Sequence, residues 1–136
     1  MQIVEVRDLP VASDKIRVRV RAAAIHAADI RFRSGSLAPM LREFAPPWVP
    51  GMDMAGNVSA IGDDVRTDLE VGDRVMGLVL PFGTAKGAYA EELLVDPDWL
   101  VRSPKDVSDA EAATLPTNGL TALLALDLLD LTPGST

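Results

Sequence analysis

The single histidine, His26, has the most versatile acid–base chemistry of any side chain in this sequence. It stands in the stretch AAAIHAADIRFRSG, and histidine titrates near neutral pH, where it can donate or accept a proton. Such a residue can donate a hydrogen bond to a substrate carbonyl or relay a proton. It can also serve structure alone, by bonding a backbone carbonyl at the end of a strand. The residues leave both roles open.

A metal role for His26 has little support. The 136 residues include no cysteine, which removes disulfides, thiolate nucleophiles and every cysteine-based zinc site. A catalytic zinc needs three protein ligands and a water, and one histidine with scattered carboxylates does not provide that set. We therefore expect no functional zinc.

Two further groups of side chains have types suited to ligand binding. The loops carry four large side chains: Met40, Phe44, Trp48 and Phe82. They suit a planar apolar ligand, and they suit core packing equally well. The second group is polar and consists of Thr117, Asn118 and Thr121. Asn118 can cap a helix that begins at Gly119, so local capping is an alternative to ligand binding for this group.

The elements that must position these residues are mostly strands. In KIRVRVRAAAI (15–25), β-branched residues alternate with basic ones, which predicts a strand with one buried face. AGNVSAI (55–61), DRVMGLVL (73–80), GAYAEELLV (87–95) and WLVRSP (99–104) predict further extended segments. GSLAPM and the Pro-rich FAPPWVPG are expected to be loops. The fold class is therefore mainly β, a twisted sandwich or partial barrel with short helices.

The C-terminal quarter predicts a pair of helices. Ser108 and Glu111 form a capping-box pattern, so a short helix should run to Leu115 and end at Pro116. A second helix fits NGLTALLALDLLDL (118–131). That helix is apolar nearly all round, and such a helix needs cover on several sides. It either packs on its own β-body or meets a partner, and we favour a partner.

Composition excludes several classes of partner. The formal net charge is −7, which argues against nucleic acid and anionic membrane. Seven of the 13 basic residues lie between Lys15 and Arg42, a zone that either attracts a phosphate-bearing ligand or is simply solvated. No signal-peptide pattern opens the chain and no apolar run reaches the length of a membrane span, so we expect a cytoplasmic protein.

Five stretches, in this order, resemble the medium-chain dehydrogenase/reductases, closest to their zinc-independent quinone oxidoreductase and enoyl reductase branch. They are AAAIHAADIRFRSG, VPGMDMAGNVSAIGDDV, LEVGDRVMG, GAYAEELLV and DAEAATLPTNGLTALLAL. Each is weak alone, and their order makes the resemblance specific. It implies a GroES-like catalytic β-domain over 1–107 and a helical bridge over 108–136 toward a cofactor-binding domain. No Gly-x-Gly-x-x-Gly occurs, so we expect no Rossmann domain within these residues, and we expect the usual N-terminal hairpin to be missing too.

The same resemblance implies an activity and assigns residues to it. The parent enzyme would use NAD(P)H to reduce quinones or α,β-unsaturated carbonyls without zinc. His26 would be the catalytic residue. Thr117, Asn118 and Thr121 would lie near the nicotinamide, and the four loop side chains would wall the substrate cleft.

Where the zinc-dependent relatives carry cysteine and histidine, this chain has His26 and Met52. The zinc-free relatives usually carry asparagine at the His26 position, so the chain departs from both patterns. Asp29 resembles a structural aspartate of the family, with Arg31 or Arg33 as its expected partner. Tyr89 is expected to pack.

Two alternatives to an active enzyme remain. The isolated chain is expected to be inactive and to bind no cofactor, because the nucleotide site belongs to the other domain. A non-enzymatic GroES-like binding or assembly module is the second possibility, since fold does not dictate function. In either case, we expect the apolar C-terminal helix to drive self-association.

Overall fold

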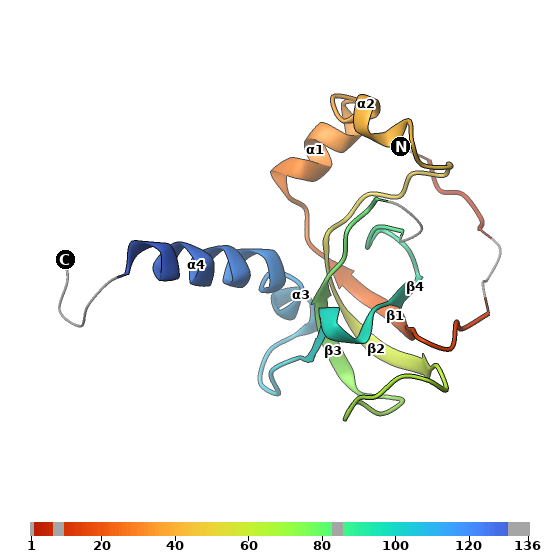
Figure 1. Cartoon of the computed structure of the whole chain (residues 1–136), viewed down its shortest axis with the longest axis vertical. Helices are drawn as coiled ribbons and strands as arrows, with labels where there is room; N and C mark the ends of the chain where they lie inside the picture. The colour runs from red at the N-terminus through yellow and green to blue at the C-terminus, as the bar shows by residue number, and fades with distance from the viewer. Residues whose placement is uncertain (1, 7–9, 83–85, 131–136) are drawn as a thin grey trace.

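Five antiparallel strands form one sheet at the centre of the molecule (Figure 1). The computed structural model describes residues 2–6, 10–82 and 86–130. The strands are β1 (Ile16–Ala23), β2 (Asp53–Ile61), β3 (Arg74–Leu78), β4 (Glu92–Val95) and β5 (Leu100–Arg102), in the order β4-β1-β2-β3-β5. The mainly β fold is as the sequence predicts, and no Rossmann domain is present among the described residues.

The period-two pattern of β1 determines which face enters the core. Ile16 and Val18 are fully buried, whereas Arg19 is exposed. Ile16 and Val18 pack with Met54, Val58 and apolar residues of the other strands in one cluster. The alternation of β-branched and basic residues therefore produces the strand that it predicts, because burial of one face stabilises this register.

Two short helices follow β1 where the sequence analysis expected no helix. α1 (Ala27–Arg33) lies within AAAIHAADIRFRSG, the stretch that contains His26. α2 (Ala38–Leu41) begins within GSLAPM and ends one residue after it. The prediction of an irregular GSLAPM loop was therefore wrong for its last three residues. Pro39 is in the first turn of α2, where a proline is tolerated because its missing N–H would have no helical partner.

The stretch GAYAEELLV is a strand only in its second half, so this predicted strand was too long. Its first half is held by backbone hydrogen bonds to the loop before β2, from Gly87 to Val49 (3.0 Å) and from Ala88 to Gly51 (2.9 Å). A Cβ on Gly87 would lie 2.2 Å from the carbonyl oxygen of Pro50. The two segments can approach this closely only because position 87 has no side chain.

The C-terminal quarter contains the capping box at the expected place. The Ser108 hydroxyl accepts from the Glu111 N–H at 3.2 Å, and the Glu111 carboxylate accepts from the Ser108 N–H at 2.8 Å. The helix that they open, α3 (Asp109–Ala112), is shorter than predicted. Pro116 does not end α3, which stops at Ala112. It is instead the first residue of α4 (Pro116–Leu129), which begins two residues earlier than expected.

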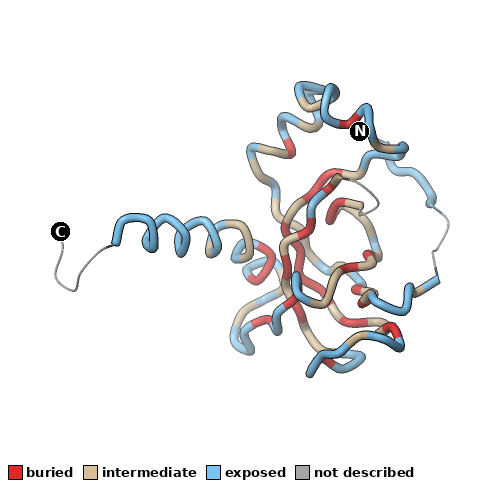
Figure 2. Tube along the Cα trace, viewed as in Figure 1, coloured by how far each residue is buried: buried red, intermediate tan, exposed pale blue. Residues whose placement is uncertain are grey.

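α4 projects from the body of the molecule and is exposed along its length from Leu120 onward (Figure 2). Leu123 is 62% exposed and Leu128 is 87% exposed. The alternative in which this helix packs on its own β-body is therefore wrong. α3, by contrast, does pack on the sheet, with Ala112 and Ala113 against Ala55. The domain division at residue 107 stays a prediction.

Candidate functional site

His26 stands at the end of β1, immediately before α1, where the chain turns away from the sheet. The backbone N–H of His26 donates to Oδ2 of Asp29 at 2.8 Å, and the Gly51 N–H donates to Oδ1 at 2.9 Å. Asp29 is buried, so its carboxylate fastens the start of α1 to the loop before β2. The anchoring role expected of Asp29 is present, but the expected partner was wrong. Within the described ranges, Asp29 pairs with neither Arg31 nor Arg33.

The imidazole of His26 faces a second buried carboxylate. Its Nε2 lies 3.0 Å from Oδ2 of Asp53, the first residue of β2, which has no exposed surface. The contact does not meet the geometry of a hydrogen bond, so it is a close approach of the ring nitrogen to the carboxylate. Only 16% of the His26 side chain is exposed, which leaves Asp53 as the polar group beside its buried nitrogen.

The same carboxylate fixes the beginning of α4. The Thr117 hydroxyl donates to Oδ1 of Asp53 at 2.5 Å, and the Thr117 N–H lies 3.1 Å from Oδ2 and 3.2 Å from Oδ1. An α-helix leaves its first N–H groups without intrahelical partners, and Asp53 satisfies one of them. Asp53 therefore joins the end of β1 to the first turn of α4 through a single buried side chain.

The other two polar candidates on α4 lie differently. Asn118 donates through Nδ2 to the Thr114 carbonyl at 2.8 Å, inside the helix, so the capping role at Gly119 was wrong. Its amide still lines a pocket beside His26. Thr121 is exposed one turn further along and does not line that pocket.

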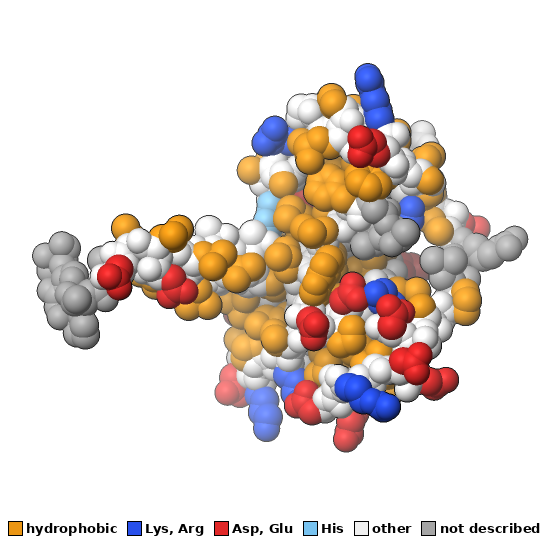
Figure 3. Space-filling view, in the orientation of Figure 1, with side chains coloured by type: hydrophobic (Ala, Val, Ile, Leu, Met, Phe, Trp, Pro, Cys, Tyr) orange, Lys and Arg blue, Asp and Glu red, His pale blue; other side chains and the backbone are white. Residues whose placement is uncertain are grey.

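The pocket occupies the corner between α1 and the base of α4, with a volume of about 390 Å³. Its walls are Ala24, Ile25, His26, Ala27, Thr114 and Asn118. In the space-filling view the histidine, in pale blue, lies at this corner (Figure 3). The structure thus brings together His26 and Asn118, residues 92 positions apart, in one apolar recess with few polar groups.

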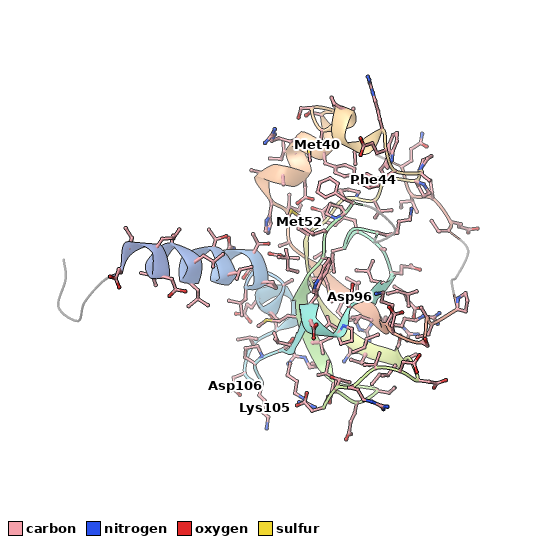
Figure 4. All side chains as sticks on the ribbon, viewed as in Figure 1. Met40, Phe44, Met52, Asp96, Lys105 and Asp106 are labelled. Atoms are coloured by element: carbon pink, nitrogen blue, oxygen red, sulfur yellow. The ribbon has the colours of Figure 1, made fainter. Side chains whose placement is uncertain are left out.

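The four large loop side chains gather elsewhere. Phe44 and Phe82 pack with ring centroids 6.3 Å apart, and the Trp48 indole donates to the Phe44 carbonyl at 2.9 Å. Met40 and Phe44 lie in the lobe that α1 and α2 form, and Met52 lies between this lobe and the sheet (Figure 4). None of these side chains lines the His26 pocket. Their role as a substrate wall stays a prediction.

Tyr89 contacts the backbone two residues before His26. Its hydroxyl donates to the Ala24 carbonyl at 3.2 Å, and it is half-buried, as expected of a packing residue. Burial, followed by the nearby negative charge of Asp29, raises the pKa of the Tyr89 phenol, so it stays neutral as a hydrogen-bond donor.

Asp53 is the important residue that the sequence analysis did not select. Its signal was an acidic residue that opens a mostly apolar strand, two positions after Gly51. A buried carboxylate requires partners, which the sequence pattern cannot name.

Over the described part of the chain, no three His, Cys, Asp or Glu side chains group as metal ligands would. No described helix combines the length and apolarity that crossing a membrane requires.

Comparison with known proteins identifies this arrangement. Residues 12–105 match the alcohol dehydrogenase GroES-like domain. The chain belongs to that family. Its place is among the medium-chain dehydrogenase/reductases, as the five ordered motifs predict.

Several of its relatives carry oxidoreductase names. The enoyl reductase component of lovastatin nonaketide synthase from Aspergillus terreus is 38% identical over 122 residues, which cover 87% of this chain and 31% of that protein. The quinone oxidoreductase from Coxiella burnetii superposes with a TM-score of 0.84 at 32% identity, over 98% of this chain and 42% of that one. A mycobacterial protein solved in complex with NADPH superposes with a TM-score of 0.73 at 29% identity, over 90% of this chain and 35% of that one. The GroES-like chain therefore spans about a third of the length of such relatives.

Proposed function

We propose that this GroES-like chain is the substrate-side domain of a zinc-independent oxidoreductase that uses NAD(P)H to reduce quinones or α,β-unsaturated carbonyls. The observation that carries the proposal is the pocket in which a titratable side chain, His26, meets the amide of Asn118 between apolar walls. A small apolar recess with few polar groups suits a planar ligand with one carbonyl to be oriented. The names of the relatives support the same class of chemistry.

The proposed roles follow from what each side chain has left to offer. The Thr117 hydroxyl and N–H are committed to Asp53, so Thr117 positions α4. Asn118 uses one N–H on the Thr114 carbonyl and keeps its other N–H and its carbonyl oxygen for a ligand amide. Such a group fits a carboxamide like that of nicotinamide. When bound, the reduced nicotinamide supplies a hydride.

His26 acts on the acceptor in this proposal. Its ring stabilises negative charge on the carbonyl oxygen, and a proton then neutralises that oxygen. We propose no zinc in this step, because the thioether of Met52 stands where zinc-dependent relatives carry histidine, and a thioether suits Zn²⁺ poorly.

The test compares two replacements of His26 in the parent enzyme, with turnover of NADPH and a quinone or enone as the measurement. His26→Ala removes every hydrogen bond from the ring and should lower kcat by roughly a hundredfold. His26→Asn keeps a donor but cannot transfer a proton, so it should retain more activity and lose the pH dependence of histidine. Asp63→Asn, an exposed change in a distant turn, is the control. Unchanged turnover and pH dependence in both His26 variants would assign His26 to structure.

For the isolated chain we expect no turnover. Titration with NADPH while the fluorescence of Trp48 and Trp99 is recorded should show no tight saturation, since the family binds its nucleotide on another domain. Tight saturable binding would contradict this expectation.

We propose that two copies of the chain associate through α4. Six leucines of this helix are 47% exposed or more, a larger apolar surface than isolated domains usually leave in water. Light scattering at increasing concentration should show the mass rising from that of a monomer to that of a dimer. A constant monomer mass would overturn the proposal. The cytoplasm remains the proposed location.

A further inference from the structure

The contact between His26 and Asp53 determines which ring nitrogen carries the proton of the neutral ring. We infer that Asp53 holds the proton of neutral His26 on Nε2, so that Nδ1 is the unprotonated nitrogen of the neutral ring. Asp53 is thus a positioning residue that acts through His26. The inference deepens the proposed function. The tautomer itself does not depend on that function, whereas any effect of the tautomer on catalysis rests on it.

The tautomer follows from what a carboxylate can do. An ionised carboxylate only accepts hydrogen bonds, and the Thr117 N–H and hydroxyl both donate to that of Asp53. These donors stabilise its charged form. An unprotonated Nε2 would turn a second region of negative charge toward Oδ2 at 3.0 Å, in a place that water does not reach. A proton on Nε2 turns this repulsion into attraction.

The other groups around His26 do not compete for that proton. Asp29, on α1, uses one carboxylate oxygen on the His26 backbone N–H and the other on Gly51. Tyr89 donates its hydroxyl to the Ala24 carbonyl. The wall from α3 and α4 contributes Thr114 and Asn118, which are uncharged. Asp53 is therefore the carboxylate that faces the ring.

The experiment uses the fact that His26 is the only histidine. Nitrogen NMR of the labelled 136-residue chain, at a pH where the ring is neutral, reports one imidazole and shows which nitrogen is protonated. We expect the Nε2–H form to predominate. Asp53→Asn should shift the ring toward a mixture, because the asparagine amide can either donate or accept. Asp63→Asn should leave the spectrum unchanged.

The wild-type spectrum decides by itself, even where Asp53→Asn fails to fold. A predominant Nδ1–H form would overturn the inference, as would a folded Asp53→Asn variant with the wild-type ratio of tautomers. The ring could carry its proton on Nε2 while replacement of His26 leaves kcat of the parent enzyme unchanged. That result would support the inferred tautomer and refute the proposed function.

Discussion

Charged side chains are usually exposed and apolar ones buried, and two regions of the molecule depart from this rule. They are the start of β2, where an aspartate is buried, and α4, along which leucines are exposed. Asp53 places a carboxylate where no water reaches it, and Leu128 is 87% exposed. The difference lies in what satisfies each exception. Asp53 accepts hydrogen bonds from Thr117 and lies beside the His26 ring, so its burial requires no partner from outside the chain. None of the described residues covers Leu128, so this side chain is buried only when another surface packs on α4.

The largest expected effect compares two truncations of apolar side chains, one from each region. Ile16→Ala removes a fully buried side chain and should lower the free energy of unfolding by about 2–5 kcal/mol, because it leaves a cavity. Leu128→Ala should change it by no more than about 0.5 kcal/mol. Urea unfolding of dilute protein measures both. Equal costs would mean that α4 packs on its own body in solution.

The second comparison removes a carboxylate from each region. Asp53→Ala leaves the buried donors of Thr117 without a partner, which should cost about 1–3 kcal/mol of unfolding free energy. Asp127→Ala, on exposed α4, should cost almost nothing. The same unfolding measurement checks both variants. Should Asp127→Ala cost as much as Asp53→Ala, burial would not be what makes Asp53 important.

The third comparison introduces a charge into two apolar side chains of similar exposure. Leu126 on α4 is 53% exposed and Val101 on β5 is 55% exposed. Leu126→Glu should weaken self-association roughly tenfold, because a dimer would have to bury the new charge. Val101→Glu should leave association unchanged. Sedimentation equilibrium measures both, and equal effects would move the proposed interface away from α4.

The smallest effect concerns α3, which links the two regions. Hydrogen bonds from the Ser108 N–H and hydroxyl lower the pKa of Glu111 from its ordinary value of 4.5. The stabilisation is therefore fully present above pH 4.5 and is lost as the pH falls through the lowered pKa of the folded state.

Ser108→Ala should remove the part of this pH dependence that comes from the hydroxyl, together with roughly 1 kcal/mol of unfolding free energy. The part that comes from the backbone N–H at position 108 should remain, because alanine keeps that donor. Thermal unfolding between acid and neutral pH tests the prediction. If Ser108→Ala kept the whole pH dependence of the wild type, the Ser108 hydroxyl would contribute nothing to it.

Local patterns were enough to predict much of the fold. Alternation in β1 and the capping box of Ser108 and Glu111 act between near neighbours in the chain, so the sequence displays them directly. The long strand expected from residue 87 to 95 failed for the opposite reason. What decides its first half is contact with distant backbone, such as the hydrogen bond from Gly87 to Val49.

The candidate site shows the same division. The sequence alone identified His26 as the residue with acid–base chemistry, and it identified α4 as a helix without enough polar surface to stand in water. Only the tertiary structure decided that Asp53 would lie between His26 and Thr117, residues 91 positions apart. A buried carboxylate takes its partners from whichever elements the sheet brings together, and no spacing along the chain encodes that meeting.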